Sequence, residues 1–480
     1  MKINNNKKAL VILTFTFLII AITIKGFHET KLIERLQLMI TGPDLESEEM
    51  TSEVKNITYS TVTTGYDWGP AIDKIILNIG TLVDSKTVDP ENFRVNAIKE
   101  SNTIAARKVI KAYTSDASGI ETTDSEYIAL DFEVGPTMAE SSPFLYDFLI
   151  GRNVYIKTAY EVSIIPESKL ATTSGNPLTF MSTDYEDLTS DIKPYCDAFV
   201  HNQDYELNSV TLKYASFTPV KQTENKIPLI IWLHGAGEGG VDTTIAVLGN
   251  NVTNLVKEET QSYFGENGAF VLVPLAPTMW MDLDGNNVYN ITVGNSDGHS
   301  YYEVALMGLI DQFVMTHQDI DTDRIYVGAC SNGGYMSVKM VIDHPDYFAA
   351  AFPAAEAYSV NWLTQERIDA LNDFPIWLTH AQNDPTVRIS EDEAVDGNFV
   401  PLDDYSSALY NRLVAAGNEN AYYSLYDKVV EPSDGYLGSD GKPYEYNGHW
   451  SWIYTLNNDC IQTINGKTTT LFEWLAKQSR

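Results

Sequence analysis

The chain has 480 residues, with 65 acidic and 32 basic side chains and a formal net charge of −33. A chain of this length exceeds the size of one hydrophobic core and predicts two or three domains. A surface with this much negative charge repels nucleic acid and anionic lipid. We therefore exclude a nucleic-acid partner. Hydrophobic residues make up 44% of the sequence, enough to build large cores, which argues against global disorder.

The N-terminus has the features of an export signal. Three lysines among the first eight residues precede an uncharged apolar run at 9–24. As a helix this run would cover roughly 24 Å, less than the roughly 30 Å of a membrane's hydrocarbon core. We predict a secreted or extracellular protein whose leader, residues 1–30, is either cleaved or kept as a membrane anchor. Residues 31–55 are expected to form a linker.

Residues 56–170 have the pattern of an all-β domain. Short β-favouring runs, separated by turns rich in Gly, Asp, Pro and Ser, are expected at 57–63, 75–79, 93–97, 127–132 and 155–164. Their number and spacing suit an immunoglobulin-like (Ig-like) sandwich. Because no catalytic cluster lies here, two roles stay open: a spacer or wall-binding module, or a domain that shapes an active site. Residues 171–208 are expected to be a connection.

From residue 209 to residue 480 the period changes, and strands alternate with helices. Apolar runs typical of buried strands are expected at 227–233, 269–273, 325–327, 349–352, 376–378 and 422–426, after a first strand at 209–215. Helical spacing of apolar residues is expected at 302–316, 335–344 and 405–416. This alternation predicts a doubly wound, mostly parallel α/β domain.

The three cysteines are Cys196, Cys330 and Cys460. An odd count without paired spacing is neither a disulfide framework nor a zinc site, and we expect no metal and no cofactor. A bridge between Cys196 and Cys460 stays open. Cys330, which precedes a serine in a predicted turn, is expected to be a small buried packing residue rather than a nucleophile.

A strand, a sharp turn and a helix are expected to meet at Ala329-Cys-Ser-Asn-Gly333. A serine at such a turn is held out of the backbone, and the following helix directs its first N–H groups at an oxyanion formed there. Ser331 is therefore the candidate nucleophile. The pattern departs from Gly-x-Ser-x-Gly because Ala329 replaces the first glycine, and we expect its one added methyl group to be tolerated.

The glycine-rich segment His-Gly-Ala-Gly-Glu-Gly-Gly at 234–240 directly follows a predicted strand. Such a turn leaves backbone N–H groups uncovered, and these can bind an oxyanion together with the residue that follows the nucleophile. We assign the donors to the main chain of Ala236, with Gly235 as the alternative, and to the main chain of Asn332. A phosphate-binding loop of the Gly-Lys-Ser/Thr kind is not indicated, because the segment lacks that ending.

A carboxylate and an imidazole complete the candidate set. Asp384 lies in the loop 379–387 at the carboxyl end of a predicted strand, where it can accept the Nδ1 proton of a histidine. Among eight histidines, His449 is the one that comes last in the chain order Ser331, Asp384, His449 and follows a glycine between aromatic residues. We predict that His449 is the general base.

Four motifs together resemble the secreted esterase and prolyl-oligopeptidase-like branch of the α/β hydrolases, and they lie at 234–238, 330–334, 380–387 and 448–452. Within that branch the chain is most similar to carboxylesterases with an N-terminal Ig-like domain. The segment 66–70, which precedes a predicted strand, resembles the entry to that domain. The resemblance covers nearly everything from residue 56 to the end. It implies a serine esterase for short acyl or phenolic esters with Ser331, Asp384 and His449 as its triad.

The identity of the substrate stays open at this point. A small-molecule ester or an ester on a polysaccharide is expected, and Trp280, His234 and Glu238 are candidates for the substrate pocket. For Trp280 a place in the core or in a lid is an equal alternative. Two other classes also stay open: a serine peptidase of the prolyl-oligopeptidase kind, and a catalytically silent surface-binding protein.

Overall fold

The computed structural model describes residues 57–480, except 101–102, 181, 287–297, 392–398 and 433–434. The expected leader and linker therefore lie outside the described residues. The described residues all belong to one compact unit of the chain. Within them, no helix combines the length and the apolar character that crossing a membrane requires.

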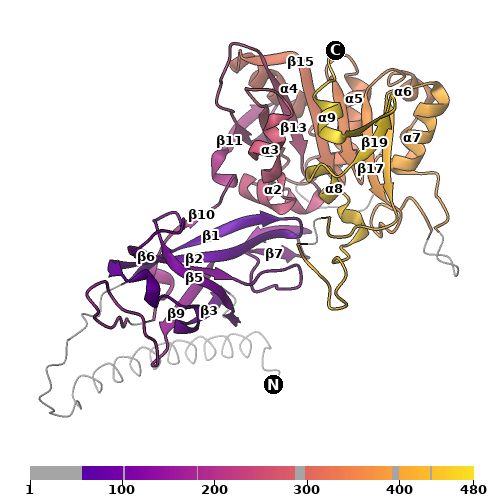
Figure 1. Ribbon diagram of the computed structural model, residues 1–480. Helices are drawn as coiled ribbons and strands as arrows, with labels where there is room; N and C mark the ends of the chain where they lie inside the picture. The colour runs from indigo at the N-terminus through magenta and orange to yellow at the C-terminus, as the bar shows by residue number, and fades with distance from the viewer. Residues whose placement is uncertain (1–56, 101–102, 181, 287–297, 392–398, 433–434) are drawn as a thin grey trace, which may run out of the picture. The chain divides into compact units, whose positions relative to one another are not determined.

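The N-terminal part is a sandwich of two sheets (Figure 1). One sheet has five strands in the order β10-β1-β2-β6-β5, and the other has three in the order β4-β3-β9. The strands are β1 (Thr58–Tyr66), β2 (Gly69–Val83), β3 (Phe93–Lys99), β4 (Ile104–Arg107), β5 (Val109–Ser115), β6 (Ser125–Phe132), β9 (Thr158–Ile164) and β10 (Leu188–Ile192). Ile75 and Leu130 from the larger sheet share one buried cluster with Val95 and Val162 from the smaller one. The predicted Ig-like sandwich is confirmed.

A two-stranded hairpin, β7 (Phe144–Asp147) with β8 (Arg152–Tyr155), forms a sheet of its own. Its turn carries Phe148 and Leu149, whose side chains are 87% and 95% exposed. At its other strand, Arg152 Nη1 donates a hydrogen bond to the carbonyl oxygen of Pro277 at 2.8 Å. The hairpin therefore belongs to the N-terminal domain by sequence but contacts the C-terminal domain.

The C-terminal part is built on an eight-stranded sheet in the order β11-β12-β14-β13-β15-β16-β17-β18. The strands are β11 (Val200–Leu207), β12 (Val210–Phe217), β13 (Ile227–Leu233), β14 (Phe270–Leu275), β15 (Ile320–Cys330), β16 (Ala350–Ala354), β17 (Ile376–Ala381) and β18 (Ala421–Tyr426). Neighbours from β14 to β18 run parallel, and only β11 and β12 are antiparallel to the strands beside them. This is the mostly parallel, doubly wound fold that the sequence predicts.

Two hydrophobic cores cover the two faces of this sheet, because side chains alternate across a strand. On β13, for example, Ile231 points into one core and Trp232 into the other. The first core includes side chains of α4 (Glu303–Thr316), α5 (Asn332–Asp343), α6 (Gln365–Asp369) and α7 (Tyr405–Ala416). The second includes side chains of α2 (Thr243–Gly249), α8 (Trp452–Leu456) and α9 (Leu471–Leu475). A short helix α3 (Glu258–Ser262) and a hairpin of β19 (Ile461–Ile464) and β20 (Lys467–Thr470) complete the domain.

The segment 171–208, expected to be a connection, contributes two strands. β10 pairs with β1 in the Ig-like sheet, whereas β11 pairs with β12 in the eight-stranded sheet. The boundary expected at 208/209 thus falls inside a hairpin turn, where Asn208 and Ser209 have φ angles of 52° and 66°. The sequence of β11 is polar because every second side chain of this edge strand is exposed, so it lacks the apolar run of a buried strand.

The three cysteines are separate buried thiols. The bridge between Cys196 and Cys460 that the sequence left open is therefore not formed. Burial raises the pKa of all three thiols. Cys330 Sγ donates to Oδ1 of Asn250 at 3.3 Å, in keeping with the packing role expected for it.

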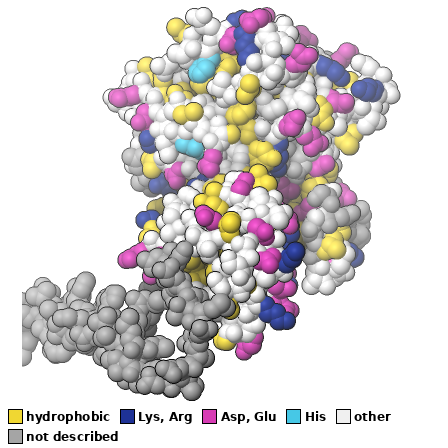
Figure 2. Space-filling model, turned by 60° about the vertical axis from the view of Figure 1, so that its left-hand side comes forward, with side chains coloured by type: hydrophobic (Ala, Val, Ile, Leu, Met, Phe, Trp, Pro, Cys, Tyr) yellow, Lys and Arg dark blue, Asp and Glu magenta, His cyan; other side chains and the backbone are white. Residues whose placement is uncertain are grey.

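Acidic side chains are spread over the face of the molecule shown in Figure 2, with basic side chains between them. Exposed ion pairs join Lys111 to Glu121 at 2.6 Å and Arg412 to Asp403 at 3.0 Å. Such pairs contribute little to stability. On this face the negative charge is distributed rather than gathered into a single patch.

Gly333 lies where α5 touches the neighbouring strand β13. A Cβ at this position would come 2.1 Å from the carbonyl oxygen of Leu233. We expect Gly333→Ala to lower the free energy of unfolding by about 3 kcal/mol, because main chain has to move to make room. Urea denaturation followed by circular dichroism measures the loss.

The matched control is Gly80→Ala. Gly80 has a φ of 66°, but nothing lies within 4 Å of an added Cβ. Backbone strain alone should then cost about 1 kcal/mol. Equal losses at the two positions would contradict the close contact at Gly333.

Candidate active site

Ser331 forms the sharp turn between β15 and α5. Its φ of 53° and ψ of −118° lie in a region that residues with a side chain seldom adopt. Two main-chain hydrogen bonds hold the turn: the N–H of Ser331 donates to Ala354 at 2.9 Å, and the carbonyl of Ser331 accepts from Tyr335 at 3.1 Å. The serine hydroxyl is thereby presented at the carboxyl end of the parallel strands.

The residues around Ser331 explain why alanine is tolerated at position 329. A Cβ at Gly334 would come 2.5 Å from Cα of Glu356, and one at Gly333 would meet main chain even more closely. Ala329, in contrast, points into the apolar core that covers one face of the sheet. The glycines are required because they face backbone, whereas position 329 faces side chains that leave room for one methyl group.

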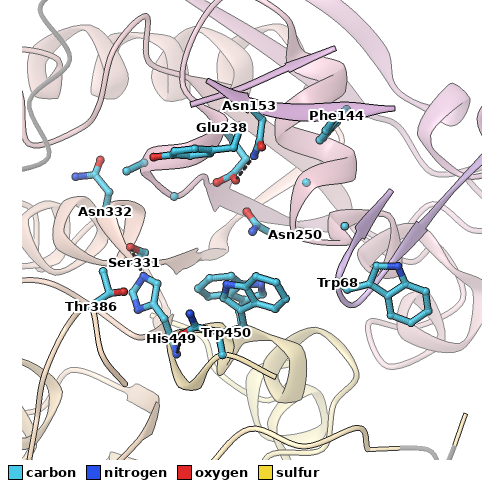
Figure 3. A pocket seen from close by; sticks show the side chains of 18 of the residues that line it. Trp68, Phe144, Asn153, Glu238, Asn250, Ser331, Asn332, Thr386, His449 and Trp450 are labelled. Carbon is cyan, nitrogen blue, oxygen red and sulfur yellow. Dashed lines mark hydrogen bonds between the residues drawn. The ribbon is translucent and has the colours of Figure 1, made fainter. Parts of the chain in front are cut away.

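Ser331, His449 and Asp384 lie in one continuous hydrogen-bonded chain. The Oγ of Ser331 is 2.8 Å from Nε2 of His449 (Figure 3). Nδ1 of His449 is in turn 2.8 Å from Oδ2 of Asp384. Because a carboxylate only accepts, Nδ1 carries the proton and Nε2 accepts from the serine hydroxyl. His449 lies in the short 3-10 helix η9 (Gly448–Trp450), where Oδ1 of Asn447 accepts its N–H at 2.9 Å.

Asp384 lies just after β17 and has no exposed side-chain surface. Its Oδ1 accepts from the main-chain N–H groups of Thr386 and Val387 at 2.7 and 2.9 Å. Burial by itself would raise the pKa of this carboxyl. Hydrogen bonds from His380 and His449 outweigh burial and hold the pKa below its usual range, so Asp384 is ionised.

His380 is a second partner of Asp384 that the sequence analysis did not assign to the site. Its Nε2 lies 3.0 Å from Oδ2 of Asp384 and 2.9 Å from the carbonyl oxygen of Val387. Both partners accept, so the proton resides on Nε2, and Nδ1 accepts from the hydroxyl of Ser406 at 2.8 Å. A histidine four residues before the aspartate at a strand end was the signal that could have identified it.

The two expected oxyanion-binding segments both border Ser331. Asn332 is the first residue of α5, and its Oδ1 accepts the N–H of Trp280 at 2.6 Å, which fixes this residue in place. Across from it, a Cβ at Gly235 would come 3.7 Å from Cβ of Ser331. The main-chain N–H of Gly235 donates to the carboxylate of Glu238. Ala236, the other expected donor, begins η5 (Ala236–Glu238).

Glu238 is the one of the three candidate pocket residues that lines the cavity beside Ser331. It is buried, and its Oε1 lies 3.4 Å from Nδ2 of Asn153 on the β7–β8 hairpin (Figure 3). Burial raises the pKa of Glu238 to about 7, although hydrogen bonds from Gly235 and Asn153 oppose this rise. At neutral pH the carboxyl is therefore partly protonated.

Trp280 and His234, the other two candidates, lie behind the cavity wall. Both are fully buried, and their rings are 5.1 Å apart. Burial lowers the pKa of His234 to about 4, so its neutral ring donates to Gly235 O at 2.6 Å and accepts from Ala276 N–H at 3.1 Å. Neither residue lines the cavity, which corrects the expectation of substrate contact and places Trp280 in the core.

A cavity of about 770 Å³ opens at Ser331 and His449. The N-terminal domain contributes part of its lining, and six aromatic side chains take part: Trp68, Phe144, Tyr146, Phe148, Trp450 and Trp452. Asp67, also in the lining, anchors that domain by accepting from Nδ2 of Asn251 at 3.2 Å and of Asn457 at 2.8 Å. Of the two roles left open for the Ig-like domain, these contacts favour shaping the active site.

In the described part of the chain no cluster of His, Cys, Asp and Glu could hold a metal ion.

Glu238 should make stability depend on pH. In the unfolded chain its carboxyl ionises around pH 4.5, whereas in the folded chain it keeps its proton to about pH 7, so stability falls as pH rises between these values. Glu238→Gln removes this loss. We expect the stability of the variant relative to the parent to improve by about 2 kcal/mol between pH 5 and pH 8, measured by urea denaturation at both values.

Glu206→Gln, on the exposed side of the edge strand β11, is the control for this effect. Its stability relative to the parent should be the same at pH 5 and pH 8. If Glu238→Gln behaves in the same way, the carboxyl of Glu238 is not held in its protonated form by burial.

Comparison with known proteins agrees with this architecture. Residues 58–179 match the esterase Ig-like N-terminal domain, and residues 306–395 match the prolyl oligopeptidase family. No curated protein matches the chain. A solved structure of a thermostable esterase is similar over 88% of this chain and 100% of its own, with 24% identity and a TM-score of 0.67.

A second solved structure, an acylaminoacyl peptidase in complex with Z-Gly-Gly-Phe-chloromethyl ketone, aligns with 60% of this chain and 44% of its own, with 14% identity and a TM-score of 0.35. The thermostable esterase thus shares the fold over nearly the whole described chain, and the two family matches identify the parts. These matches support a serine hydrolase in which an Ig-like domain, similar to that of esterases, precedes an α/β-hydrolase fold that is similar in part to the prolyl oligopeptidase family.

Proposed function

We propose that the protein hydrolyses carboxylic esters through an acyl-enzyme, with Ser331, His449 and Asp384 as its catalytic triad. The observation that carries this proposal is the pair of 2.8 Å hydrogen bonds that join the three side chains at the edge of the cavity. The ester substrate is supported by the match of residues 58–179 to a domain described for esterases. The likeness to a thermostable esterase agrees with it.

The reaction begins when Nε2 of His449 takes the proton of Ser331 and the serine Oγ attacks the ester carbonyl. The carbonyl oxygen becomes an oxyanion that accepts hydrogen bonds from the main-chain N–H groups of Asn332 and Ala236, each worth about 3 kcal/mol. The alcohol then leaves with the proton of His449. Water repeats the attack on the acyl-enzyme, releases the acid and restores the serine.

Asp384 stabilises the charge that develops on His449 when it takes the proton. Because two histidines and two main-chain N–H groups donate to this carboxylate, it stays ionised and stays in one orientation. His380 does not compete as the base, since both of its ring nitrogens already have partners in the protein interior. It acts as a positioning residue for Asp384.

The substrate is a small-molecule ester or an ester on a polysaccharide, and the export signal predicted at the N-terminus supports a site of action outside the cytoplasm. A serine peptidase is the second candidate. The match of residues 306–395 to the prolyl oligopeptidase family favours it specifically. Ester and peptide substrates therefore have to be compared directly on the same preparation.

Ser331→Ala should lower kcat about 10⁵-fold or more on every substrate, because it removes the nucleophile. The assay uses the purified protein with p-nitrophenyl acetate, a phenolic ester and alanyl-proline p-nitroanilide. Ester hydrolysis at a far higher kcat/KM than cleavage of the anilide is the expected result. The control is Ser337→Ala on the same helix, whose hydroxyl donates only to the Gly334 carbonyl.

Three outcomes distinguish the candidates. Preference for the anilide would replace the esterase with a peptidase. No turnover of any substrate by the parent protein would favour a surface-binding protein. Full activity in Ser331→Ala would show that another group is the nucleophile.

Asp384→Asn should lower kcat about 10⁴-fold with little change in KM, because the amide cannot stabilise an imidazolium at His449 and can favour the wrong tautomer. Steady-state kinetics on p-nitrophenyl acetate measure both parameters. Asp427→Asn is the control, since Asp427 lies on the exposed surface and accepts from Gln382 Nε2 at 2.8 Å. A loss confined to KM would contradict the assigned role of Asp384.

A further inference from the structure

The proposed reaction leaves the aromatic side chains of the cavity without a role. Four of them belong to the N-terminal domain, namely Trp68, Phe144, Tyr146 and Phe148, and Trp450 and Trp452 belong to the hydrolase domain. Figure 3 shows Trp450 beside His449, with Phe144 and Asn153 on the opposite side of the open space. Aromatic rings from two domains thus line one cavity together with the proposed catalytic base.

Two of these rings are left uncovered by the protein itself. The side chain of Phe148 is 87% exposed and that of Tyr146 is 38% exposed, although both lie on the cavity. Water-exposed aromatic surface of this kind costs free energy unless a ligand or partner covers it. The uncovered rings therefore mark a binding surface.

The hairpin that carries these rings is held in a fixed position. The Oη of Tyr146 donates to Gly151 O at 2.9 Å, and its ring meets that of Phe148 edge to face at 5.1 Å. On the other strand, Arg152 and Asn153 hydrogen-bond to Pro277 and Glu238 of the hydrolase domain. These contacts hold the hairpin in one position before a ligand binds. A ligand that enters the cavity therefore does not have to order these aromatic side chains, which lowers the entropic cost of binding.

We infer that the space between Trp450 and the β7–β8 hairpin is a subsite for an aromatic ring of the substrate, so that the N-terminal domain selects which ester is cleaved. This inference rests on the proposed esterase function. The occupant has to be joined to the ester, because the subsite and Ser331 share one cavity. A planar ring fits best, since rings pack edge to face or offset against one another and gain attraction beyond apolar burial.

The test compares substrates that differ only in whether one six-membered carbon ring is aromatic or saturated. One pair is methyl 3-phenylpropanoate and methyl 3-cyclohexylpropanoate, with the ring on the acyl side. The other pair is 2-phenylethyl acetate and 2-cyclohexylethyl acetate, with the ring on the alcohol side. Ethyl acetate is the short reference. In at least one pair the phenyl ester should have a kcat/KM about fivefold higher than its cyclohexyl partner.

Tyr146→Ala and Phe148→Ala should each bring this phenyl preference close to one, mainly through a higher KM for the phenyl ester. Leu145→Ala and Leu149→Ala are matched controls on the same hairpin, because both side chains are exposed and neither lines the cavity. The controls should keep the preference of the parent. Thermal unfolding checks that all four variants are folded.

The outcomes separate this inference from the function on which it rests. If the parent cleaves none of the esters, the proposed function fails. If the parent cleaves them with no phenyl preference in either pair, or if the preference survives in Tyr146→Ala and Phe148→Ala, the aromatic subsite is overturned while the esterase stands. Loss of the preference in the controls as well would also overturn it, because the effect would then come from the hairpin as a whole rather than from its cavity-facing rings.

Discussion

The arrangement of the active site depends on the buried carboxylate of Asp384. A buried charge is stable only when hydrogen bonds replace its lost water, and here main-chain N–H groups and two histidines supply them. His380 donates a hydrogen bond to the same carboxylate oxygen as His449, and its other ring nitrogen accepts from the hydroxyl of Ser406. This arrangement leaves the carboxylate one orientation, which fixes the imidazole of His449 and, through it, the hydroxyl of Ser331.

A second constraint is the close approach of main chain at the turn that presents Ser331. The strained backbone of this residue persists because Ala354 and Tyr335 hold it and because two glycines let the helix approach the neighbouring strands. The same helix start places the N–H of Asn332 next to the serine. Strain, close packing and the proposed oxyanion donor are therefore consequences of one local geometry.

The N-terminal domain lines part of the cavity at Ser331 and His449. Asp67 accepts hydrogen bonds from two asparagines of the hydrolase domain, while Arg152 and Asn153 contact the loops that flank Ser331. Asn153 reaches Glu238, which in turn holds the main chain of Gly235. A change in the Ig-like domain can therefore reach both the wall of the cavity and the proposed oxyanion-binding turn. This coupling gives a physical reason for the two domains to occur in one chain.

The sequence by itself determined the two kinds of fold, since a strand period followed by strand–helix alternation is a local pattern. It also identified Ser331, Asp384 and His449 as a set, because each follows a strand or a glycine turn in an order that brings their loops to one edge of a parallel sheet. The edge strand β11 and the hairpin strands β7 and β8 were harder to predict. Their side chains are polar or exposed, so their sequences lack the pattern of alternating buried apolar residues.

Only the tertiary structure decided which side chains face the cavity and which are buried in the core behind it. Trp280 and His234 follow strands as a pocket residue would, but packing from distant segments buries them in the core. Trp68 and Trp450 lie in motifs visible in the sequence, but their place on one cavity depends on how two domains meet. Local spacing carries no information on contacts between segments hundreds of residues apart, and those contacts determine what the cavity can hold.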